Sequence, residues 1–293
     1  MAAPHPAATP MPISAIIMTR NEAGNLPECL ASVAWADEVL VVDSLSTDDT
    51  VAVAERAGAR VVQHSFANYA AQRNYAQAQA AYDWVLFIDA DERVSTDLRD
   101  EITALAAAGE LGRNNAYHIQ RVHLISGRWF TTPPDRTATP KLRAALRRLE
   151  VPRLFDRRQA AWHRALHEEV SVPEPHGVLD GVICHYAGTN LSLTLESFNT
   201  YSSLEAAYLH QQGKQASMLT ALWRGARTFA FHYVVQGWFR NGENGLLMAA
   251  IAGMNKFTNY AKLWERRRIE ARQGTWTEAD RAMLERYRVE DQD

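Results

Sequence analysis

Cysteine is scarce in this chain of 293 residues, since only Cys29 and Cys184 occur. Two cysteines cannot build a disulfide framework or a zinc cluster, and such low usage is typical of a reducing compartment. Long apolar runs are also lacking: the longest, around residues 229–239, is interrupted by polar residues and is too short to cross a bilayer. We therefore expect a protein that is not integral to a membrane. Residues 1–12 have neither a basic start nor an apolar core, which predicts a disordered tail rather than a signal peptide.

Glycine-rich phosphate loops are missing as well. No Gly-x-Gly-x-x-Gly follows the first expected strand, and no Gly-Lys-Ser/Thr loop occurs. These absences argue against a dinucleotide dehydrogenase and a P-loop nucleotidase. A sugar-nucleotide pyrophosphorylase would need a Gly-rich loop bearing Arg or Lys at the same place, and that loop is absent too. Any phosphate bound here would therefore be held through a metal ion rather than by a glycine cradle.

The net charge of −3 hides an asymmetry along the chain. Residues 1–111 hold 6 Lys or Arg against 16 Asp or Glu, whereas residues 112–170 hold 12 against 5. A basic segment after an acidic one suggests contact with a phosphate-bearing partner or an anionic membrane face. A solvated surface is the commoner explanation of such a segment. We expect no nucleic acid partner.

An apolar run that ends in acids is the feature around which the chain is organised. Residues 84–88 are all apolar, and Asp89, Asp91 and Glu92 follow them. A continuous apolar strand suits the middle of a parallel sheet that is covered on both faces. Open α/β sheets bind ligands outside the carboxyl ends of their strands, where two carboxylates would suit Mg²⁺ or Mn²⁺. On spacing alone, a solvated acidic turn is an equal alternative.

Strand and helix patterns alternate four times in about the first hundred residues. The expected strands cover residues 13–18, 38–42, 60–63 and 84–88, and helices are expected through Leu26, Leu30 and Val33 and over residues 49–57, 68–81 and 96–108. This alternation predicts an α/β fold with a mostly parallel, doubly wound sheet and helices on both faces. Helical periodicity dominates from residue 191 onward.

Four segments resemble the successive nucleotide-sugar motifs of family 2 glycosyltransferases, which have the GT-A fold: ISAIIMTRNEAGNLPECLASV, VLVVDSLSTDDT, ANYAAQRNYA and WVLFIDADE. Further on, the chain is similar to the bacterial subgroup that adds glucose to the inner core of lipopolysaccharide, in PRLFDRR, ALHEEV, GVICHY and FTNYAKLWERR. The resemblance implies a GT-A domain at residues 13–190, with a nucleotide-sugar-binding half at 13–111 and an acceptor and catalytic half at 112–190. A C-terminal helical region would follow at 191–293.

The resemblance also implies a donor site. Thr19, Glu22 and Asp43 would line the uridine pocket, with Asp43 accepting from the base or the ribose. Arg73 would reach the base or the diphosphate, and Arg153 the donor phosphate or the acceptor. The position of Asp43 at the carboxyl end of an expected strand agrees with this, although a carboxylate that favours a helix N-terminus is the alternative.

A metal, Mg²⁺ or Mn²⁺, would be held by Asp89 and Asp91 according to the same resemblance. His185, at the end of an expected strand over residues 182–185, would add a nitrogen ligand. The metal neutralises charge that develops on the departing diphosphate, so it stabilises the transition state selectively. The sugar carbon passes through an oxocarbenium-like state. An inverting transferase then needs one general base and no covalent nucleophile.

For that base the sequence offers Glu168, which aligns with the His-Glu motif of the subgroup. Glu169 is the adjacent competitor, and on a strand it would point to the opposite face. His167 is expected to orient or hydrogen-bond. A partly buried carboxylate beside a phosphate-metal site can serve as a base with only a modest rise of its pKa. An acidic pair on an edge strand is the alternative without a chemical role.

One stretch departs from the pattern of the subgroup. There a Trp/Tyr-Pro-Asp stretch runs almost directly into Arg-Leu-Phe, whereas here residues 136–152 separate Asp135 from Arg153. Within this basic insert, Pro140 could start a short amphipathic helix that lies on an anionic membrane surface or grips a phosphorylated acceptor. A solvated lid is the other interpretation. The insert leaves the acceptor open and does not change the expected chemistry.

Aromatic residues gather near arginines between residues 223 and 240. This grouping suits a peripheral membrane interface, and a helical core or a homodimer face are equally good interpretations. We predict an inverting, metal-dependent transferase that moves a hexose, by the resemblance glucose, from a UDP-sugar to a lipopolysaccharide-core or other lipid-linked glycan at the cytoplasmic face of the membrane. The nearest alternative is a transferase for an exopolysaccharide or another glycan. A non-catalytic nucleotide-sugar-binding protein is the alternative from a different class.

Overall fold

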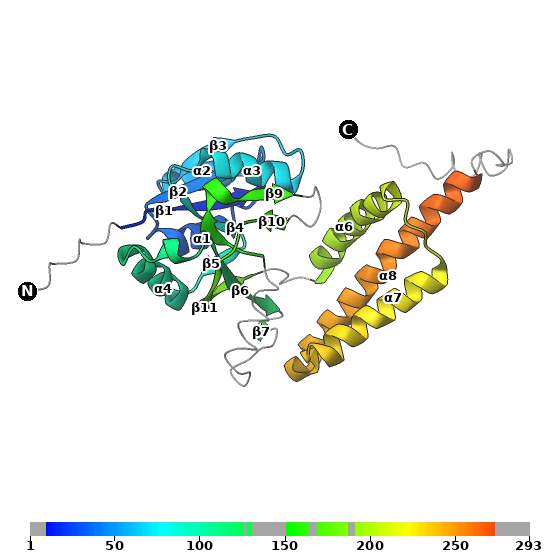
Figure 1. Ribbon diagram of the computed structural model, residues 1–293. Coiled ribbons are helices and arrows are strands. Elements are labelled where there is room, and N and C mark those ends of the chain that lie inside the picture. Colours follow the sequence, from blue (N-terminus) through cyan, green and yellow to red (C-terminus); the bar gives the residue numbers. More distant parts are fainter. Residues whose placement is uncertain (1–9, 126–127, 131–150, 164–168, 187–190, 273–293) are drawn as a thin grey trace, which may run out of the picture. The chain divides into compact units, whose positions relative to one another are not determined.

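The computed structural model describes residues 10–125, 128–130, 151–163, 169–186 and 191–272 (Figure 1). The chain forms two compact units, residues 1–190 and residues 191–293. Several features expected from the sequence fall outside the described residues: the tail as far as residue 9, the basic insert as far as residue 150, His167 and Glu168.

The first unit is built around a nine-stranded sheet with the strand order β3-β2-β1-β4-β8-β6-β11-β5, in which β7 also pairs with β6. Its strands are β1 (Ile13–Thr19), β2 (Glu38–Asp43), β3 (Arg60–Gln63), β4 (Trp84–Asp89), β5 (Glu92–Val94), β6 (Ala116–Ile125), β7 (Arg128–Phe130), β8 (Leu154–Asp156) and β11 (His176–His185). Its α-helices are α1 (Leu26–Val33), α2 (Thr50–Arg56), α3 (Tyr69–Gln79) and α4 (Thr96–Ala107), and short 3₁₀ turns are η1 (Leu111–Arg113) and η2 (Arg157–Gln159). A separate hairpin consists of β9 (Ala161–His163) and β10 (Glu169–Ser171).

Six strands of this sheet run in the same direction. β1 is parallel to β2 and β4, β2 is parallel to β3, and β6 is parallel to β11. β8 is antiparallel to both β4 and β6, so β6 and β11 share the direction of the first four strands. The predicted mostly parallel sheet is therefore confirmed, and the carboxyl ends of these six strands lie along one edge.

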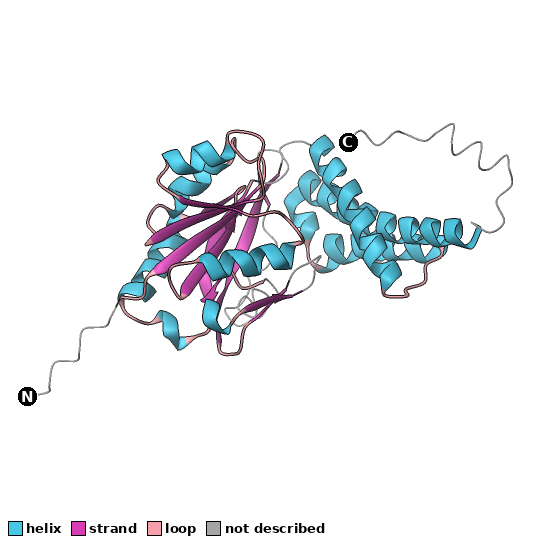
Figure 2. Cartoon of the chain, turned by 90° about the horizontal axis from the view of Figure 1, so that it is seen from above, coloured by secondary structure: helices cyan, strands magenta, loops and turns pink. Residues whose placement is uncertain are grey.

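The residues of β4 alternate between two hydrophobic cores. Trp84, Leu86 and Ile88 pack with residues of α1 and α4 on one face, and Val85 and Phe87 pack with residues of α3 on the other. All five are buried. Because side chains alternate across a strand, a strand that is covered on both faces must be apolar throughout. Figure 2 shows helices on both faces of the sheet, as the sequence predicts.

Capping residues fix the helix ends close to the predicted bounds. The Asn68 side chain accepts a hydrogen bond from the backbone nitrogen of Ala71 at 2.9 Å at the start of α3. The Ser95 side chain accepts from the backbone nitrogen of Leu98 at 3.2 Å at the start of α4. After α2 the chain turns at Gly58, whose φ of 80° lies in the left-handed region that glycine favours.

The second unit is helical. It consists of α6 (Leu191–Gln211), α7 (Met218–Ala230), the π-helical turn η3 (Phe231–Val235), the 3₁₀ turn η4 (Trp238–Asn241) and α8 (Gly242–Arg272). α7 and α8 cross closely at Gly225 and Gly253. A Cβ added to Gly225 would lie 2.9 Å from the Gly253 carbonyl oxygen, and a Cβ added to Gly253 would lie 3.0 Å from the Gly225 carbonyl oxygen. None of the helices in the described part of the chain is long and apolar enough to span a bilayer.

Candidate active site

The candidate site lies at the edge of the sheet where the parallel strands end. Thr19 ends β1, Asp43 ends β2, Asp89 ends β4 and His185 ends β11. In the register of the sheet Thr19 is paired with Asp43, and Met18 with Asp89, so these side chains come from neighbouring strands. Residues that are far apart in the sequence thus meet at the edge where open α/β sheets bind ligands.

Asp89 is held by two arginines. Arg73 donates from Nη2 to Oδ1 at 3.1 Å, and Arg153 Nη2 lies 3.4 Å from Oδ2. Arg73 is only 7% exposed, and its guanidinium lies over the ring of Trp162, 4.8 Å from the centroid. Burial raises the pKa of Asp89, but Arg73, Arg153 and Arg121 outweigh it and hold this pKa below its usual range. Asp89 is therefore an ionised carboxylate that fixes two guanidinium groups.

Glu92, the third acid of the run, is completely buried. Its Oε1 accepts from Arg153 at 3.0 Å and from Arg121 at 3.2 Å, and its Oε2 accepts from the backbone nitrogen of Asp89 at 2.9 Å. Together with Arg73, three guanidinium groups face two carboxylates, which leaves a surplus of positive charge. Such a surplus suits an anionic ligand such as a diphosphate.

Asp91 pairs with a histidine instead of an arginine. His185 Nε2 lies 3.1 Å from Asp91 Oδ2, and His185 Nδ1 lies 2.8 Å from His123 Nδ1. His123 and His185 are register partners on β6 and β11. Burial, the charge of Arg121 and the nearby His185 lower the pKa of His123 to about 3. The His123 ring is therefore neutral at pH 7.

The three expected metal ligands do not form one ligand set. Among the residues that the structure describes, no group of three His, Cys, Asp or Glu side chains is placed to hold a metal ion. Asp91 and His185 supply one oxygen and one nitrogen side by side, whereas arginines hold Asp89. Mg²⁺ usually takes one or two carboxylates and completes its coordination with water and substrate phosphates. The residues present therefore fit a metal that is shared with a bound diphosphate, and they do not enclose a metal alone.

Asp43 is completely buried and well supplied with donors. Thr19 Oγ1 donates to Oδ1 at 3.1 Å, and the Ser46 backbone nitrogen and Gln63 Nε2 donate to Oδ2 at 2.9 and 3.2 Å. The Ser46 hydroxyl also donates to Oδ1. In this state the carboxylate fixes the loop after β2. A direct bond to a base or a ribose, as expected from the resemblance, would require that it exchange one of these donors.

Glu22 lies in the loop after β1 and is half-buried. Burial raises the pKa of Glu22; the hydrogen bond from Asn25 Nδ2, at 2.8 Å, opposes this effect, and the charges of Asp91 and Asp48 add to it. Glu22 follows the end of β1 by three residues, which places it at the same edge as the acidic run. The predicted donor residue thus lies within the electrostatic reach of the site.

Two loop residues at this edge have a left-handed backbone although neither is glycine. Asn21 has a φ of 56° and Leu45 a φ of 58°. The Asn21 backbone nitrogen donates to Ser46 Oγ at 2.8 Å, and the Thr47 backbone nitrogen donates to Asn21 Oδ1 at 2.8 Å, so the loops after β1 and β2 are joined. Leu45 is 55% exposed. A bulky side chain in this region is an outlier, and such strain concentrates at functional sites.

The hairpin of β9 and β10 is anchored to the helix that carries Arg73. Asn74 Nδ2 donates to the Trp162 carbonyl, and the Trp162 backbone nitrogen donates to Asn74 Oδ1, both at 2.9 Å. Glu168 precedes β10 in the sequence and lies outside the described residues, while Glu169 begins β10 with an exposed side chain. The assignment of the base therefore stays a prediction.

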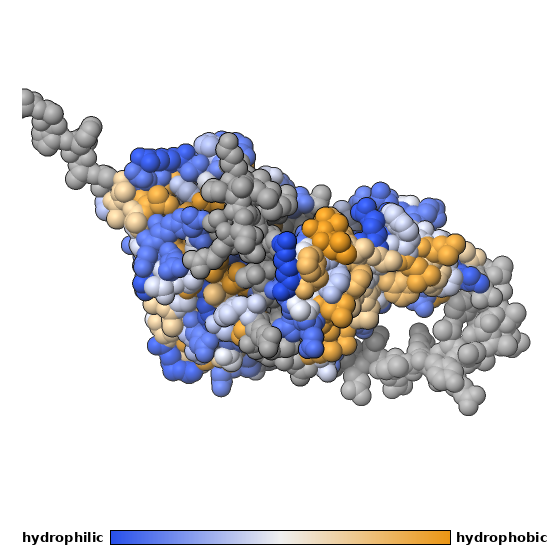
Figure 3. All heavy atoms as spheres, turned by 90° about the horizontal axis from the view of Figure 1, so that it is seen from below, coloured by the Kyte–Doolittle hydropathy of each residue, from blue (hydrophilic) through white to orange (hydrophobic). Residues whose placement is uncertain are grey.

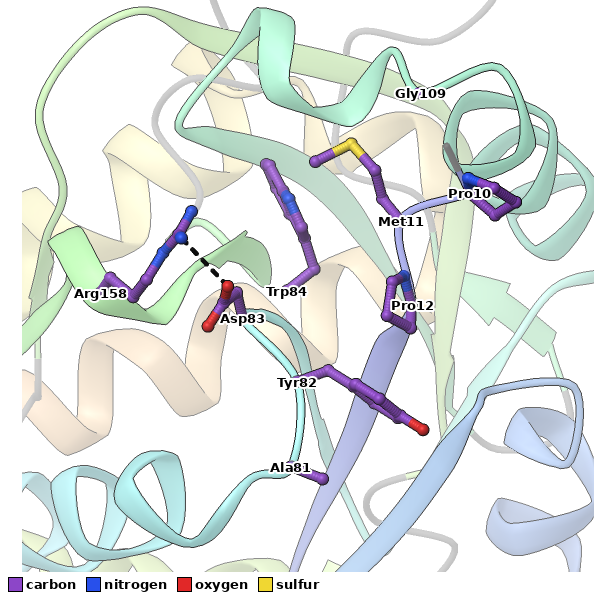
Figure 4. Close-up of a pocket in the computed structure, with 9 residues that line it drawn as sticks. All are labelled: Pro10, Met11, Pro12, Ala81, Tyr82, Asp83, Trp84, Gly109 and Arg158. Carbon is purple, nitrogen blue, oxygen red and sulfur yellow. Dashed lines mark ion pairs between the residues drawn. The ribbon is translucent and has the colours of Figure 1, made fainter. Parts of the chain in front are cut away.

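A pocket of about 530 Å³ lies at the opposite edge of the sheet (Figure 4). It is lined by Pro10, Met11, Pro12, Ala81, Tyr82, Asp83, Trp84, Gly109 and Arg158. These residues include those just before β1 and at the start of β4, and Arg158 is already paired with Asp83 at 3.0 Å. Because parallel sheets bind ligands at the carboxyl ends of their strands, size alone does not make this pocket the active site.

Sequence reasoning gave no role to four residues of the site: Glu92, Arg121, His123 and Trp162. Arg121 and His123 are two positions apart on β6, a spacing that places side chains on one face of a strand. That signal is visible in the sequence, but it requires β6 to be recognised as a strand first. The position of Trp162 under Arg73 has no local signal.

Comparison with known proteins shows which family the chain resembles. Residues 14–163 match the sequence profile of glycosyl transferase family 2. An uncharacterized glycosyltransferase of Rickettsia felis is 32% identical over 264 residues, which cover 86% of this chain and 89% of the relative. The lipopolysaccharide core biosynthesis glycosyltransferase LpsC of Rhizobium meliloti is 27% identical over 269 residues, covering 89% of this chain and 95% of the relative. The crystal structure of S. aureus TarS 1-349 in complex with UDP-GlcNAc has a TM-score of 0.49 and 17% identity, and covers 97% of this chain and 95% of that one.

The chain belongs to glycosyl transferase family 2. It is a glycosyltransferase with a GT-A-like fold and a C-terminal helical region, which confirms the predicted family, fold class and enzyme class. A non-catalytic nucleotide-sugar-binding protein is not the class that these relatives indicate.

Proposed function

We propose that this glycosyltransferase moves a hexose, with glucose as the first candidate, from a UDP-sugar to a lipopolysaccharide-core or other lipid-linked glycan, with inversion at the sugar carbon. The observation that carries the donor half of the proposal is the set of charged residues at the carboxyl edge of the sheet. Arg73, Arg121 and Arg153 meet Asp89 and Glu92 there. The match to LpsC, whose name refers to lipopolysaccharide core biosynthesis, supports the acceptor half.

The diphosphate of the donor would take up the surplus positive charge of this network. Arg73 and Arg153 are nearly buried and fixed by Asp89, so they present guanidinium groups in a set orientation. One arginine guanidinium can bind two phosphate oxygens at once. A guanidinium that is already held in place loses little conformational freedom on binding. Thr19, Glu22 and Asp43, on the neighbouring strand ends and loops, would then line the uridine side.

A divalent ion, Mg²⁺ or Mn²⁺, would be held by Asp91 and His185 together with the diphosphate. When bound, it supplies positive charge to the leaving group. For His185 Nε2 to offer its lone pair, the ring proton must be on Nδ1. Neutral His123, in the tautomer that carries its proton on Nε2, would accept that hydrogen bond at Nδ1, 2.8 Å away, and hold the ring in place.

Glu168 would be the general base that takes the proton from the acceptor hydroxyl. Support comes from the hairpin, because Trp162 on β9 lies against Arg73 and Glu168 directly precedes β10. Glu168→Gln keeps the shape of the side chain but removes its basicity. We expect turnover to fall by about 10²- to 10⁴-fold with donor binding retained, whereas Glu169→Gln should change turnover little. Unchanged turnover in Glu168→Gln would mean that the base is elsewhere.

Thermal unfolding with a panel of nucleotides and nucleotide-sugars, with and without Mn²⁺, tests the donor site. A ligand that binds only the folded state raises the Tm by mass action. We expect UDP and a UDP-hexose to raise the Tm in the presence of Mn²⁺, and Asp91→Ala to abolish the dependence on Mn²⁺. Asp100→Ala, on the exposed surface of α4, is the matched control and should respond as the wild type does.

A larger rise of the Tm with another nucleotide would overturn the choice of UDP. A response to UDP that does not depend on Mn²⁺ would remove the metal from the proposal and leave the arginines as the phosphate ligands. The acceptor is tested separately, by transfer from a radiolabelled UDP-hexose to lipid-linked glycans and to water-soluble glycans. Transfer to soluble glycans alone would favour the alternative of an exopolysaccharide or another glycan product.

A further inference from the structure

Large apolar side chains cover the outer face of α7 and the turns after it. On α7 they are Leu219, Leu222 and Trp223, and in the turns they are Phe231, Val234, Val235 and Phe239, all of them exposed. Leu219 is 78% exposed and Val235 is 72% exposed. We call these seven residues the apolar outer face. Figure 3 shows hydrophobic residues gathered on the helical unit.

The side of α7 that packs inside the helical unit carries small residues. Ala221 and Gly225 are the buried residues of α7, and Gly225 meets Gly253 of α8 at close range. This arrangement reverses the usual amphipathic helix of a globular protein, in which the large apolar residues face the core. An exposed apolar face of this size on a soluble protein marks an interaction site.

The charge of the same segment has one sign. Residues 206–242 contain four Lys or Arg and no Asp or Glu. The Arg227 guanidinium lies 5.4 Å from the centre of the Trp223 ring, and that of Arg240 lies 5.6 Å from the centre of the Phe239 ring. Arginine beside exposed aromatic rings is the combination found where proteins contact the interface of a bilayer.

This charge decides between a lipid surface and a second copy of the chain. In a symmetric dimer the same patch meets itself. Arg227 and Arg240 would then approach the arginines of the other copy, and the exposed Glu243 that follows the segment supplies one carboxylate against these two arginines. Anionic lipid headgroups supply the missing negative charge, and the hydrocarbon beneath them takes the apolar side chains.

We propose that the apolar outer face binds an anionic membrane surface. Leu219, Leu222 and Trp223 enter the headgroup region, and Arg227 and Arg240 contact lipid phosphates. The protein binds as a peripheral protein, through one face of the helical unit. This attachment gives the proposed transferase access to a lipid-linked acceptor, but it does not depend on the identity of the donor.

Co-sedimentation with vesicles tests the proposal. The wild type should bind vesicles that contain phosphatidylglycerol and phosphatidylcholine more tightly than vesicles of phosphatidylcholine alone. The double variant Leu219→Gln with Trp223→Gln should lower the partition coefficient at least tenfold. Leu204→Gln, which changes an exposed leucine of α6, is the control and should bind as the wild type does. Arg227→Gln and Arg240→Gln should each weaken binding to the anionic vesicles by about fivefold.

Three results would overturn the proposal. They are no binding of the wild type to anionic vesicles, equal binding by the wild type and the double variant, and a wild-type dimer that the double variant converts to a monomer. The last outcome, seen by light scattering, would assign the face to a second copy. The Tm of each variant with UDP and Mn²⁺ is measured in parallel: an unchanged Tm response shows that the unit with the donor site is folded, and it separates failure here from failure of the donor assignment.

Discussion

The two units of the chain distribute their charged and apolar residues in opposite ways. In the α/β unit, charged groups such as Glu92 and Arg73 are buried at the carboxyl edge of the sheet, and apolar residues are covered on both faces. In the helical unit, small residues fill the crossing of α7 and α8, and large apolar residues lie outside. The first unit pairs its buried charged groups internally. The second leaves large apolar side chains exposed.

The largest effect should come from the buried acid of the α/β unit. Glu92→Gln removes the charge that Arg153 and Arg121 face, so we expect the free energy of unfolding in urea to fall by about 3–5 kcal/mol. Glu28→Gln is the control, because Glu28 is exposed and pairs with Arg93 at 3.4 Å; it should change stability by less than about 1 kcal/mol. Equal losses in the two variants would show that burial of a carboxylate at this edge does not increase its contribution to the free energy of unfolding.

The histidine pairs of β6 and β11 give the next prediction. His123→Phe keeps an aromatic ring at this position but removes the nitrogen that would accept the hydrogen bond from His185 Nδ1. The Mn²⁺ dissociation constant in the presence of UDP should therefore rise about 10- to 100-fold. His118→Phe is the control: His118 Nε2 pairs with His176 Nδ1 at 3.1 Å at the other end of the same strands. Electron paramagnetic resonance of free Mn²⁺ measures both constants. The same constant in both variants would dismiss a role for His123 in orienting His185.

The helical unit should lose stability to different extents when its two faces are substituted. Gly225→Val places side-chain atoms where the Gly253 carbonyl already lies, and we expect it to lower the free energy of unfolding by about 1–3 kcal/mol. Ala226→Val, on the exposed side of α7, should cost about 0.5 kcal/mol, which is the helix-propensity difference alone. Chemical denaturation compares them. Similar losses would mean that the close crossing of α7 and α8 does not limit side-chain size.

The smallest effect concerns the strained loop of the donor site. Leu45→Gly relieves the left-handed backbone, so the free energy of unfolding should rise by up to about 1 kcal/mol while the Tm response to UDP weakens. Leu45→Ala removes the side chain but keeps the strain. It should weaken the UDP response without the gain in stability. An undiminished UDP response in both variants would remove Leu45 from the donor site.

The sequence predicts the first four strands and their helices because each is specified locally. Apolar runs mark β1, β2 and β4, and Asn68, Ser95 and Gly58 mark helix ends. The later strands are not predicted in the same way. β6 carries buried polar side chains, among them His118 and Gln120, so its apolar alternation is broken.

The candidate site is predictable only in part for the same reason. Asp43, Asp89 and His185 end strands, and a strand end is a local signal. The burial of Arg73 depends on Trp162, and the pairing of His123 with His185 depends on a register between strands 62 residues apart. No local pattern encodes either. These contacts follow from tertiary packing, which hydrophobic periodicity and helix-capping residues do not predict.

The arginine network of the proposed donor site has a consequence for the effect of salt. Arg73 and Arg153 are nearly buried and paired with Asp89 and Glu92, so the proposed donor would bind in a region that mobile ions hardly reach. Arg227 and Arg240 are exposed, and a salt solution screens them fully. Raising the ionic strength should therefore weaken binding to anionic vesicles while UDP remains bound. A cell that changed its ionic conditions would alter where this enzyme works and leave its hold on the donor intact.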